Sequence, residues 1–200
     1  MRKVKLQMQI SLDGFVTAGY GGTNFIWDSE VRNFSINNLT NVDCIILGRN
    51  MSEGFLYWKE VANNPKDSDY IFAQKVTDIP KVIFSKTLKT SKWDNSSIVK
   101  GEIEEEIKTL KKKKGKDIIV YGGYSFVSSL IQYRLIDEFY LLVNPFAVGS
   151  GEAIFNSLKS HLQLTLVECK PFTCGTVLLH YQPNINSNKD ETTIVSLPMV

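Results

Sequence analysis

The first strand is marked by strict alternation of apolar and polar positions. Val4, Leu6, Met8 and Ile10 are separated by polar residues, and this period of two is typical of a β-strand. Short runs of consecutive apolar, β-branched residues follow, and such runs are typical of buried strands. These runs cover residues 42–47, 81–84, 97–99, 118–121 and 139–143. Two alternating segments near the end, residues 162–168 and 176–181, predict an antiparallel hairpin.

Segments with apolar residues at helical spacing separate these strands. Asp28 or Ser29 can cap a helix that runs to about residue 39, and a charged helix spans about residues 102–113. Asn50 is predicted to cap a short helix, and Ser125 is predicted to cap the helix after residues 118–121. Strands that alternate with helices, followed by a hairpin, predict an α/β fold with a mostly parallel sheet, helices on both faces and an antiparallel edge.

One domain, residues 1–183, is therefore expected, followed by a polar tail, residues 184–200. We expect this tail to be disordered, although residues 192–195 could add an edge strand. A glycine-rich segment, residues 19–23, follows the first strand. It is either a simple connection or a flap over a ligand.

Composition narrows the class of protein. A chain of 200 residues with 43% hydrophobic residues and a mean hydropathy of -0.10 can bury a substantial core. The net charge of +2 gives no argument for bulk attraction to nucleic acid or membranes, and no apolar run approaches the ~18 residues of a membrane span. The three cysteines are an odd number in a chain too large to need disulfides. With no signal peptide in evidence, we predict a cytoplasmic protein.

The segment Asp117 to Ile131 carries the strongest chemical signal. A short buried strand, the pair Gly122–Gly123 and a helix follow one another there. Glycines allow close approach to the backbone, and the free N–H groups of a helix start favour phosphate; alternatively, the pair only turns the chain. In parallel sheets ligands bind beyond the carboxyl ends of the strands. Residues 48–50, 85–87 and 122–125 all lie at such ends, which favours a dinucleotide site.

Two other groups of residues have simpler explanations. His161, Cys169, Cys174 and His180 cluster around the hairpin, but their spacing fits no structural zinc pattern, so we predict no metal site. The lysines at residues 111–116 could bind nucleic acid. Their place at the end of a helix, where cations offset the helix dipole, favours a solvated helix end, and we expect no nucleic-acid or membrane partner.

Five motifs in order resemble the dihydrofolate-reductase-like family that includes the reductase domain of the bifunctional riboflavin-biosynthesis enzyme. They are SLDGF (residues 11–15), LGRNMSEGF (47–55) with Tyr57–Trp58, FSKTL (84–88), VYGGYSF (120–126) and LIDEFYLLVNPFAVGSGEAIF (135–155). The similarity covers about residues 3–182. It implies a twisted mixed sheet with NADPH lying across the rim at the carboxyl ends of its strands.

The resemblance also implies roles for individual residues. Cofactor-binding positions would be Val16, Ala18, Gly48, Arg49, Asn50, Ser85, Lys86, Gly122, Gly123, Tyr124, Ser125 and Phe126. Substrate-facing positions would be Asp13, Trp27, Tyr121 and Phe146. Trp27 would stack on a flat ring or belong to the core, and Asp13 would be the acid or only a turn residue before Gly14.

Two departures from the family pattern concern the substrate. Asn50 stands where Thr or Ser is usual, and Tyr121 stands where the riboflavin reductases typically have an acidic residue, which puts the pyrimidine substrate of that pathway in question. We expect an NADPH-dependent reductase of a small pterin-, folate- or pyrimidine-like heterocycle. The alternatives are a non-catalytic nucleotide-binding or scaffolding protein and, third, a nucleic-acid-binding protein. A homodimer joined through the hairpin edge is expected.

Overall fold

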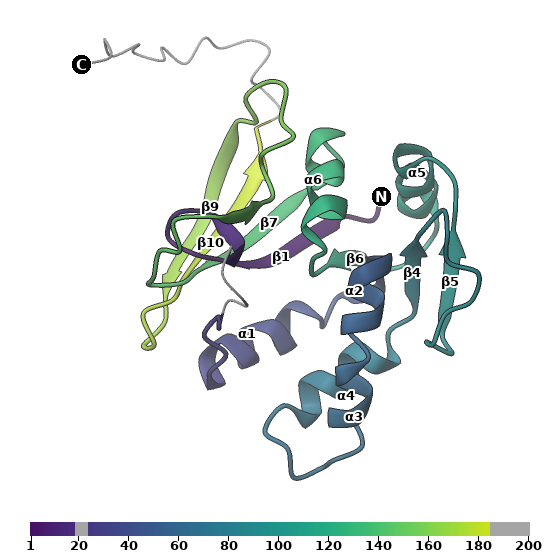
Figure 1. The fold of residues 1–200 in the computed structure, drawn as a ribbon, viewed down its shortest axis with the longest axis horizontal. Helices are drawn as coiled ribbons and strands as arrows, with labels where there is room; N and C mark the ends of the chain where they lie inside the picture. The colour runs from purple at the N-terminus through teal and green to yellow at the C-terminus, as the bar shows by residue number, and fades with distance from the viewer. Residues whose placement is uncertain (19–23, 185–200) are drawn as a thin grey trace.

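The computed structural model describes residues 1–18 and 24–184. Its main sheet has eight strands, six of them parallel, with an antiparallel pair at one edge (Figure 1). In sheet order these are β5 (Ser96–Val99), β4 (Lys81–Phe84), β3 (Val42–Gly48), β6 (Asp117–Val120), β1 (Val4–Ile10), β7 (Glu138–Val143), β10 (Val177–Pro183) and β9 (Leu164–Pro171). The predicted α/β class, with a mostly parallel sheet and a C-terminal hairpin, is confirmed. The predicted flap and nearly all of the tail fall outside the described residues.

Helices cover both faces of this sheet (Figure 1). On one face α5 (Ile103–Lys112) and α6 (Tyr124–Gln132) pack on side chains such as Cys44 and Ile46 of β3. On the other face lie α1 (Ser29–Asn38), α2 (Arg49–Gly54), α3 (Tyr57–Val61) and α4 (Tyr70–Asp78). They cover Ile45 and Leu47, the alternate residues of the same strand. Among the described residues no helix is long and apolar enough to cross a membrane.

Alternation alone would suggest that the polar positions of β1 are exposed, but they are largely buried. Lys5 and Gln7 are only 9% and 4% exposed. Gln7 donates to the Ser35 hydroxyl and accepts from the Asn38 amide, so it is the surface on which α1 packs. The strand was placed correctly, but both of its faces are covered because α1 supplies polar partners.

Two predicted helix caps are wrong. Asp28 caps α1 as expected, accepting from the backbone N–H of Val31. For α2 the N-cap is Gly48 rather than Asn50, and for α6 it is Gly123 rather than Ser125, with no side-chain cap in either case. A Cβ on Gly48 would lie 3.1 Å from Phe126 Cβ, so close packing of β3 on α6 selects glycine over a capping side chain. Helices α3 and α4 had not been predicted.

A second sheet holds the segment after β1. Strand β2 (Phe15–Ala18) pairs antiparallel with β8 (Gly151–Ala153). A Cβ on Gly151 would lie 1.7 Å from the Thr17 carbonyl oxygen, so only glycine permits this pairing. The small sheet fixes β2 beside the carboxyl end of β1.

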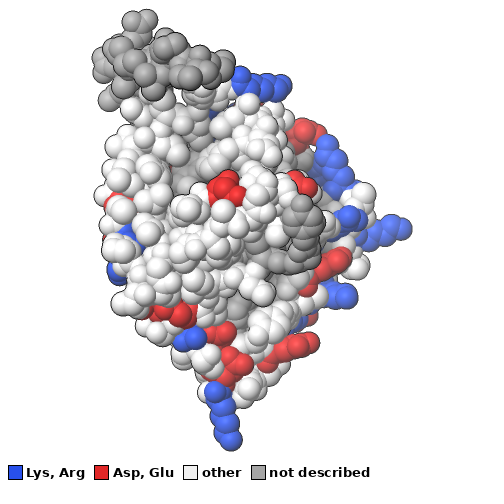
Figure 2. All heavy atoms as spheres, turned by 60° about the vertical axis from the view of Figure 1, so that its left-hand side comes forward, with Lys and Arg blue, Asp and Glu red and all other residues white. Residues whose placement is uncertain are grey.

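The hairpin leaves β9 as the outer strand of the main sheet. Residues of β9 are exposed along almost its whole length, and Leu166 and Val167 are 50% and 52% exposed. Figure 2, which brings the hairpin side forward, shows largely uncharged surface over this face. The outer strand carries the charged residues Glu168 and Lys170 beside the exposed Leu166 and Val167. Because an outer strand can pair with another chain, the homodimer stays a prediction with a defined edge to test.

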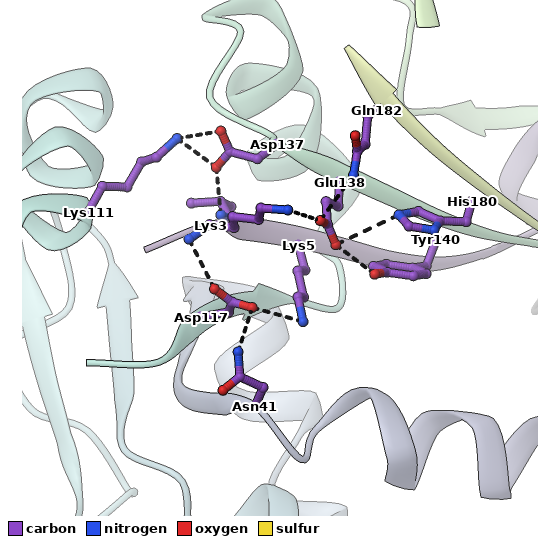
Figure 3. Close-up of polar contacts among 11 residues, drawn as sticks. Lys3, Lys5, Asn41, Lys111, Asp117, Asp137, Glu138, Tyr140, His180 and Gln182 are labelled. Atoms are coloured by element: carbon purple, nitrogen blue, oxygen red, sulfur yellow. Dashed lines mark hydrogen bonds and ion pairs between the residues drawn. The ribbon is translucent and has the colours of Figure 1, made fainter. Parts of the chain in front are cut away.

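Ion pairs gather at the amino ends of β1, β6 and β7, away from the carboxyl-end rim (Figure 3). Glu138 accepts from Lys3 Nζ at 2.5 Å, Tyr140 Oη at 2.6 Å and Gln182 Nε2 at 3.3 Å. His180 lies 3.7 Å from the same carboxylate, and its ring stacks on Tyr140 with centroids 4.2 Å apart. Its buried Nε2 has no hydrogen-bond partner among the described residues.

This burial predicts a pH dependence of stability that one substitution removes. Burial lowers the pKa of His180 below its ordinary value of 6.5, so the folded state disfavours the charged ring even beside Glu138. The free energy of unfolding should therefore be highest above pH ~6.5 and fall as the pH drops through the window just below it. We expect His180→Phe, which keeps the stack on Tyr140, to flatten this fall in urea unfolding curves. An unchanged slope would contradict the prediction, and the exposed His161→Phe is the matched control.

Candidate functional site

A single cavity of about 1060 Å³ runs along the carboxyl ends of the parallel strands. We call it the rim cavity. It lies over β5, β4, β3, β6 and β1 in turn, and the three strand ends selected from sequence all contribute to it. Predicted residues that line it are Val16, Trp27, Gly48, Arg49, Asn50, Ser85, Lys86, Tyr121, Gly122, Gly123, Tyr124, Ser125 and Phe126. Single-ligand pockets measure about 300–1,000 Å³, so the volume suits a large ligand or two molecules.

Glycines and a helix start form the middle of the rim cavity. Gly122 and Gly123 have φ angles of 152° and 75°, which L-residues with side chains rarely adopt. They lead directly into α6, whose N-cap has no side-chain hydrogen bond. The N–H groups of the first turn of α6 are therefore left for another acceptor, and together with the helix dipole they favour an anion.

Three cations define one half of the rim cavity, which we call the cationic half. Arg49 follows β3, Lys86 follows β4 and Lys100 follows β5. Lys86 Nζ lies 2.9 Å from Glu102 Oε1, but both side chains are more than two-thirds exposed, so the pair is weak and Lys86 can turn to a ligand. Lys100 was missed from sequence, although its position directly after a predicted strand was the available signal.

Aromatic rings define the other half, the aromatic half, lined by Phe25, Trp27, Phe55, Trp58, Phe72 and Tyr121. The Trp58 and Phe72 rings meet edge to face with centroids 4.9 Å apart, and Trp27 meets Phe72 in the same way at 5.1 Å. Trp27 Nε1 donates to Asp69 Oδ1 at 2.9 Å. Trp27 is thus both packed against its neighbours and part of the cavity wall. The two roles considered from sequence, packing in the core and stacking on a flat ring, are therefore compatible.

Tyr121 contributes its ring to this wall. Its hydroxyl oxygen is enclosed and has no hydrogen-bond partner among the described residues. Phe55 and Phe72 lie against the ring, at centroid distances of 5.6 and 6.1 Å. Burial raises the pKa of the Tyr121 hydroxyl above its ordinary value, so the residue stays neutral.

Three predicted residues do not line the rim cavity: Asp13, Ala18 and Phe146. Phe146 stacks behind Phe25, with centroids 5.8 Å apart, and Ala18 pairs with Gly151. Asp13 accepts from the Ser11 hydroxyl at 2.5 Å and from the backbone N–H of Gly149 at 2.7 Å. These hydrogen bonds, of which the one from Ser11 has the largest effect, lower the pKa of Asp13. The bond from Gly149 also holds the loop before β8 in place. A direct role for Asp13 as an acid stays a prediction.

The residues around the rim cavity suit a dinucleotide better than a metal. Glycine backbone, helix N–H groups and three cations match phosphates, and the aromatic half suits a flat ring. No acidic residue is among the described residues that line the cavity. Within residues 1–18 and 24–184, no group of three or more His, Cys, Asp and Glu side chains could hold a metal ion.

Comparisons with known proteins agree with this fold. The family model of the RibD C-terminal domain matches residues 2–178. The uncharacterized protein YyaP of Bacillus subtilis is 31% identical over 186 residues, which is 92% of this chain and 96% of YyaP. A Shewanella sp. PV-4 protein ascribed to riboflavin biosynthesis superposes with a TM-score of 0.72 at 20% identity, covering 92% of this chain and 99% of its own.

A bifunctional enzyme shows the same fold over part of its length. It is the diaminohydroxyphosphoribosylaminopyrimidine deaminase/5-amino-6-(5-phosphoribosylamino)uracil reductase of Thermotoga maritima. It superposes with a TM-score of 0.65 at 14% identity, over 92% of this chain and 57% of that protein. At these identities the solved structures support the fold, and the match to the family model carries the assignment to a family.

Proposed function

Because the chain belongs to the RibD C-terminal domain family, we propose that it is an NADPH-dependent reductase of a small pterin-, folate- or pyrimidine-like heterocycle. One observation carries the proposal: the rim cavity joins a cationic half to an aromatic half through a glycine-lined middle. Phosphates fit the cationic half and the glycine-lined middle, and a flat ring fits the aromatic half. The match spans nearly the whole chain, and the Thermotoga deaminase/reductase has the same fold over 57% of its length.

The residues of the chain divide the work of binding. Gly122, Gly123 and the start of α6 hold the pyrophosphate, and Arg49 adds charge beside it. Lys86 and Lys100 meet the 2′-phosphate that distinguishes NADPH from NADH. When bound, NADPH supplies the hydride.

Orientation and proton supply fall to the remaining residues. Val16 and Thr17 line the cavity beside the aromatic half, where they bring nicotinamide and substrate together. Asp13, the predicted acid, lies outside the described lining and would supply the proton through water. Asp13 keeps the neighbouring loop in place.

Titration with the two nicotinamide cofactors tests the proposal. We expect NADPH to bind more tightly than NADH, and Lys86→Ala to weaken NADPH binding about tenfold without changing NADH binding. One charge-assisted hydrogen bond of ~1.5 kcal/mol corresponds to that factor. The measurement is isothermal titration calorimetry, and Lys108→Ala, an exposed lysine paired with Glu104, is the matched control.

Three outcomes separate the alternatives. Absence of NADPH binding to the wild-type chain would remove the reductase proposal. If Lys86→Ala lost the same amount of affinity for NADH as for NADPH, Lys86 would not contact the 2′-phosphate. Tight NADPH binding without oxidation across folates, pterins and pyrimidine intermediates would favour the nucleotide-binding or scaffolding protein instead.

A further inference from the structure

Charge is unevenly divided along the rim cavity. Every charged residue in its described lining, Arg49, Lys86 and Lys100, belongs to the cationic half. Around the aromatic half the described lining is uncharged. Arg32, whose Nε lies 2.5 Å from Asp69 Oδ1, is held by the carboxylate that also binds Trp27. Within the part of the chain that the structure describes, the aromatic half thus offers no cation to a phosphate.

Gln9 is a partly exposed side chain of the aromatic half that retains a hydrogen-bond donor without a protein acceptor, whereas the unpaired Tyr121 hydroxyl is enclosed. Asn144 is fixed in orientation, because its Oδ1 accepts from the Ile26 N–H while its Nδ2 donates to the Ile10 and Leu142 carbonyls. The same Nδ2 donates to Gln9 Oε1 at 3.0 Å. This contact turns the Gln9 oxygen away, so its Nε2 group, with no protein acceptor among the described residues, is available in the cavity wall.

Gln7, the other amide in this wall, is differently placed. Its Nε2 donates to Ser35 and its Oε1 accepts from Asn38, each at 2.8 Å. Gln7 is also only 4% exposed, whereas Gln9 is partly exposed. Gln9 is therefore the amide that a ligand in the aromatic half can reach.

From these observations we infer that the aromatic half takes an uncharged planar ring that carries a hydrogen-bond acceptor and no phosphate, and that Gln9 selects it through Nε2. This inference rests on the proposed reductase and names its substrate class. Rings of Trp27 and Trp58 supply flat apolar contact, and a carbonyl or ring nitrogen accepts from Gln9. A phosphate would lie there without a cation, at a desolvation cost that no contact offsets.

Calorimetry with three probes tests the inference. 2,4-Dioxopteridine represents an uncharged ring with carbonyls, and uridine and uridine 5′-phosphate differ only in the phosphate. Each is titrated into protein saturated with NADP⁺, so that the cationic half is filled. We expect 2,4-dioxopteridine to bind and uridine to bind at least tenfold more tightly than uridine 5′-phosphate. Equal or tighter binding of the phosphate, or no binding of 2,4-dioxopteridine, would overturn the inference.

Two variants test Gln9 itself. Gln9→Leu removes the donor, and Gln9→Glu replaces the donor but keeps an oxygen for Asn144, so the second preserves the packing if the first does not fold. Both variants should bind 2,4-dioxopteridine at least tenfold more weakly than the wild-type chain and should keep its affinity for NADP⁺. Gln74→Glu on the exposed side of α4 is the matched control. Unchanged ring affinity in Gln9→Glu would exclude the assigned role. If NADP⁺ fails to bind the wild-type chain, titration without it still tests ring binding separately.

Discussion

Gly123→Val is expected to weaken NADPH binding at least about 100-fold in calorimetry while the chain still folds. Gly123 has φ of 75°, which a β-branched residue adopts only with strain of ~1–2 kcal/mol. A Cβ there would lie 3.6 Å from Met51 Cβ, and the two further methyl groups of valine would enter the glycine-lined middle of the rim cavity. Losing two charge-assisted hydrogen bonds of ~1.5 kcal/mol each gives the expected factor.

Gly149→Val is the matched control for this substitution. Gly149 has the same φ of 75°, but a Cβ added there would have no atom within 4 Å, and the residue does not line the rim cavity. The variant should lose a similar amount of stability in urea and keep its affinity for NADPH. Equal loss of affinity in both variants would show that backbone strain, and not obstruction of the glycine-lined middle, decides binding.

The meeting of the three strand ends was predictable because it follows from topology. Parallel strands share one carboxyl edge, so Gly48, Lys86 and Gly122 had to lie on the same rim once their strands were assigned. The pair Gly122–Gly123 could likewise be predicted as a place where a ligand approaches the backbone closely. These features needed only the assignment of parallel strands, without any side-chain detail.

The aromatic half could not be predicted in the same way. Phe72 comes from α4, far from every motif, and Trp58 comes from α3, just after the LGRNMSEGF motif. Apolar residues on helices look like ordinary core, so neither was predicted to line a site. Gln9 lay on the polar side of an alternating strand, and only the contact with Asn144 shows which way its amide points. The wrong cap of α2 has a related cause, since packing between β3 and α6 overrides local capping preference, whereas at the start of α6 the φ of 75° favours glycine at position 123.

Glu138 shows that a residue important for stability can be equally hard to predict from sequence. In sequence it is one acid in a run of residues before an apolar strand, with nothing to mark it as buried. In the fold its side chain is 7% exposed, and Lys3, Tyr140 and Gln182 all donate to it. Burial by itself would raise the pKa of Glu138, but the contacts with Lys3 and Tyr140 together outweigh it and lower that pKa, so the residue is ionised at neutral pH.

Glu138→Ala should therefore lower the free energy of unfolding by about 3 kcal/mol in urea at pH 7, because it leaves the partly buried Tyr140 hydroxyl without its acceptor and removes the carboxylate beside His180. Glu104→Ala removes an equally lysine-paired but exposed carboxylate and should cost less than ~0.5 kcal/mol. Since Glu138 lies at the amino ends of the strands, its loss should not change NADPH affinity in the folded chain. Similar stability losses for the two variants would mean that water reaches the Glu138 site and screens its contacts.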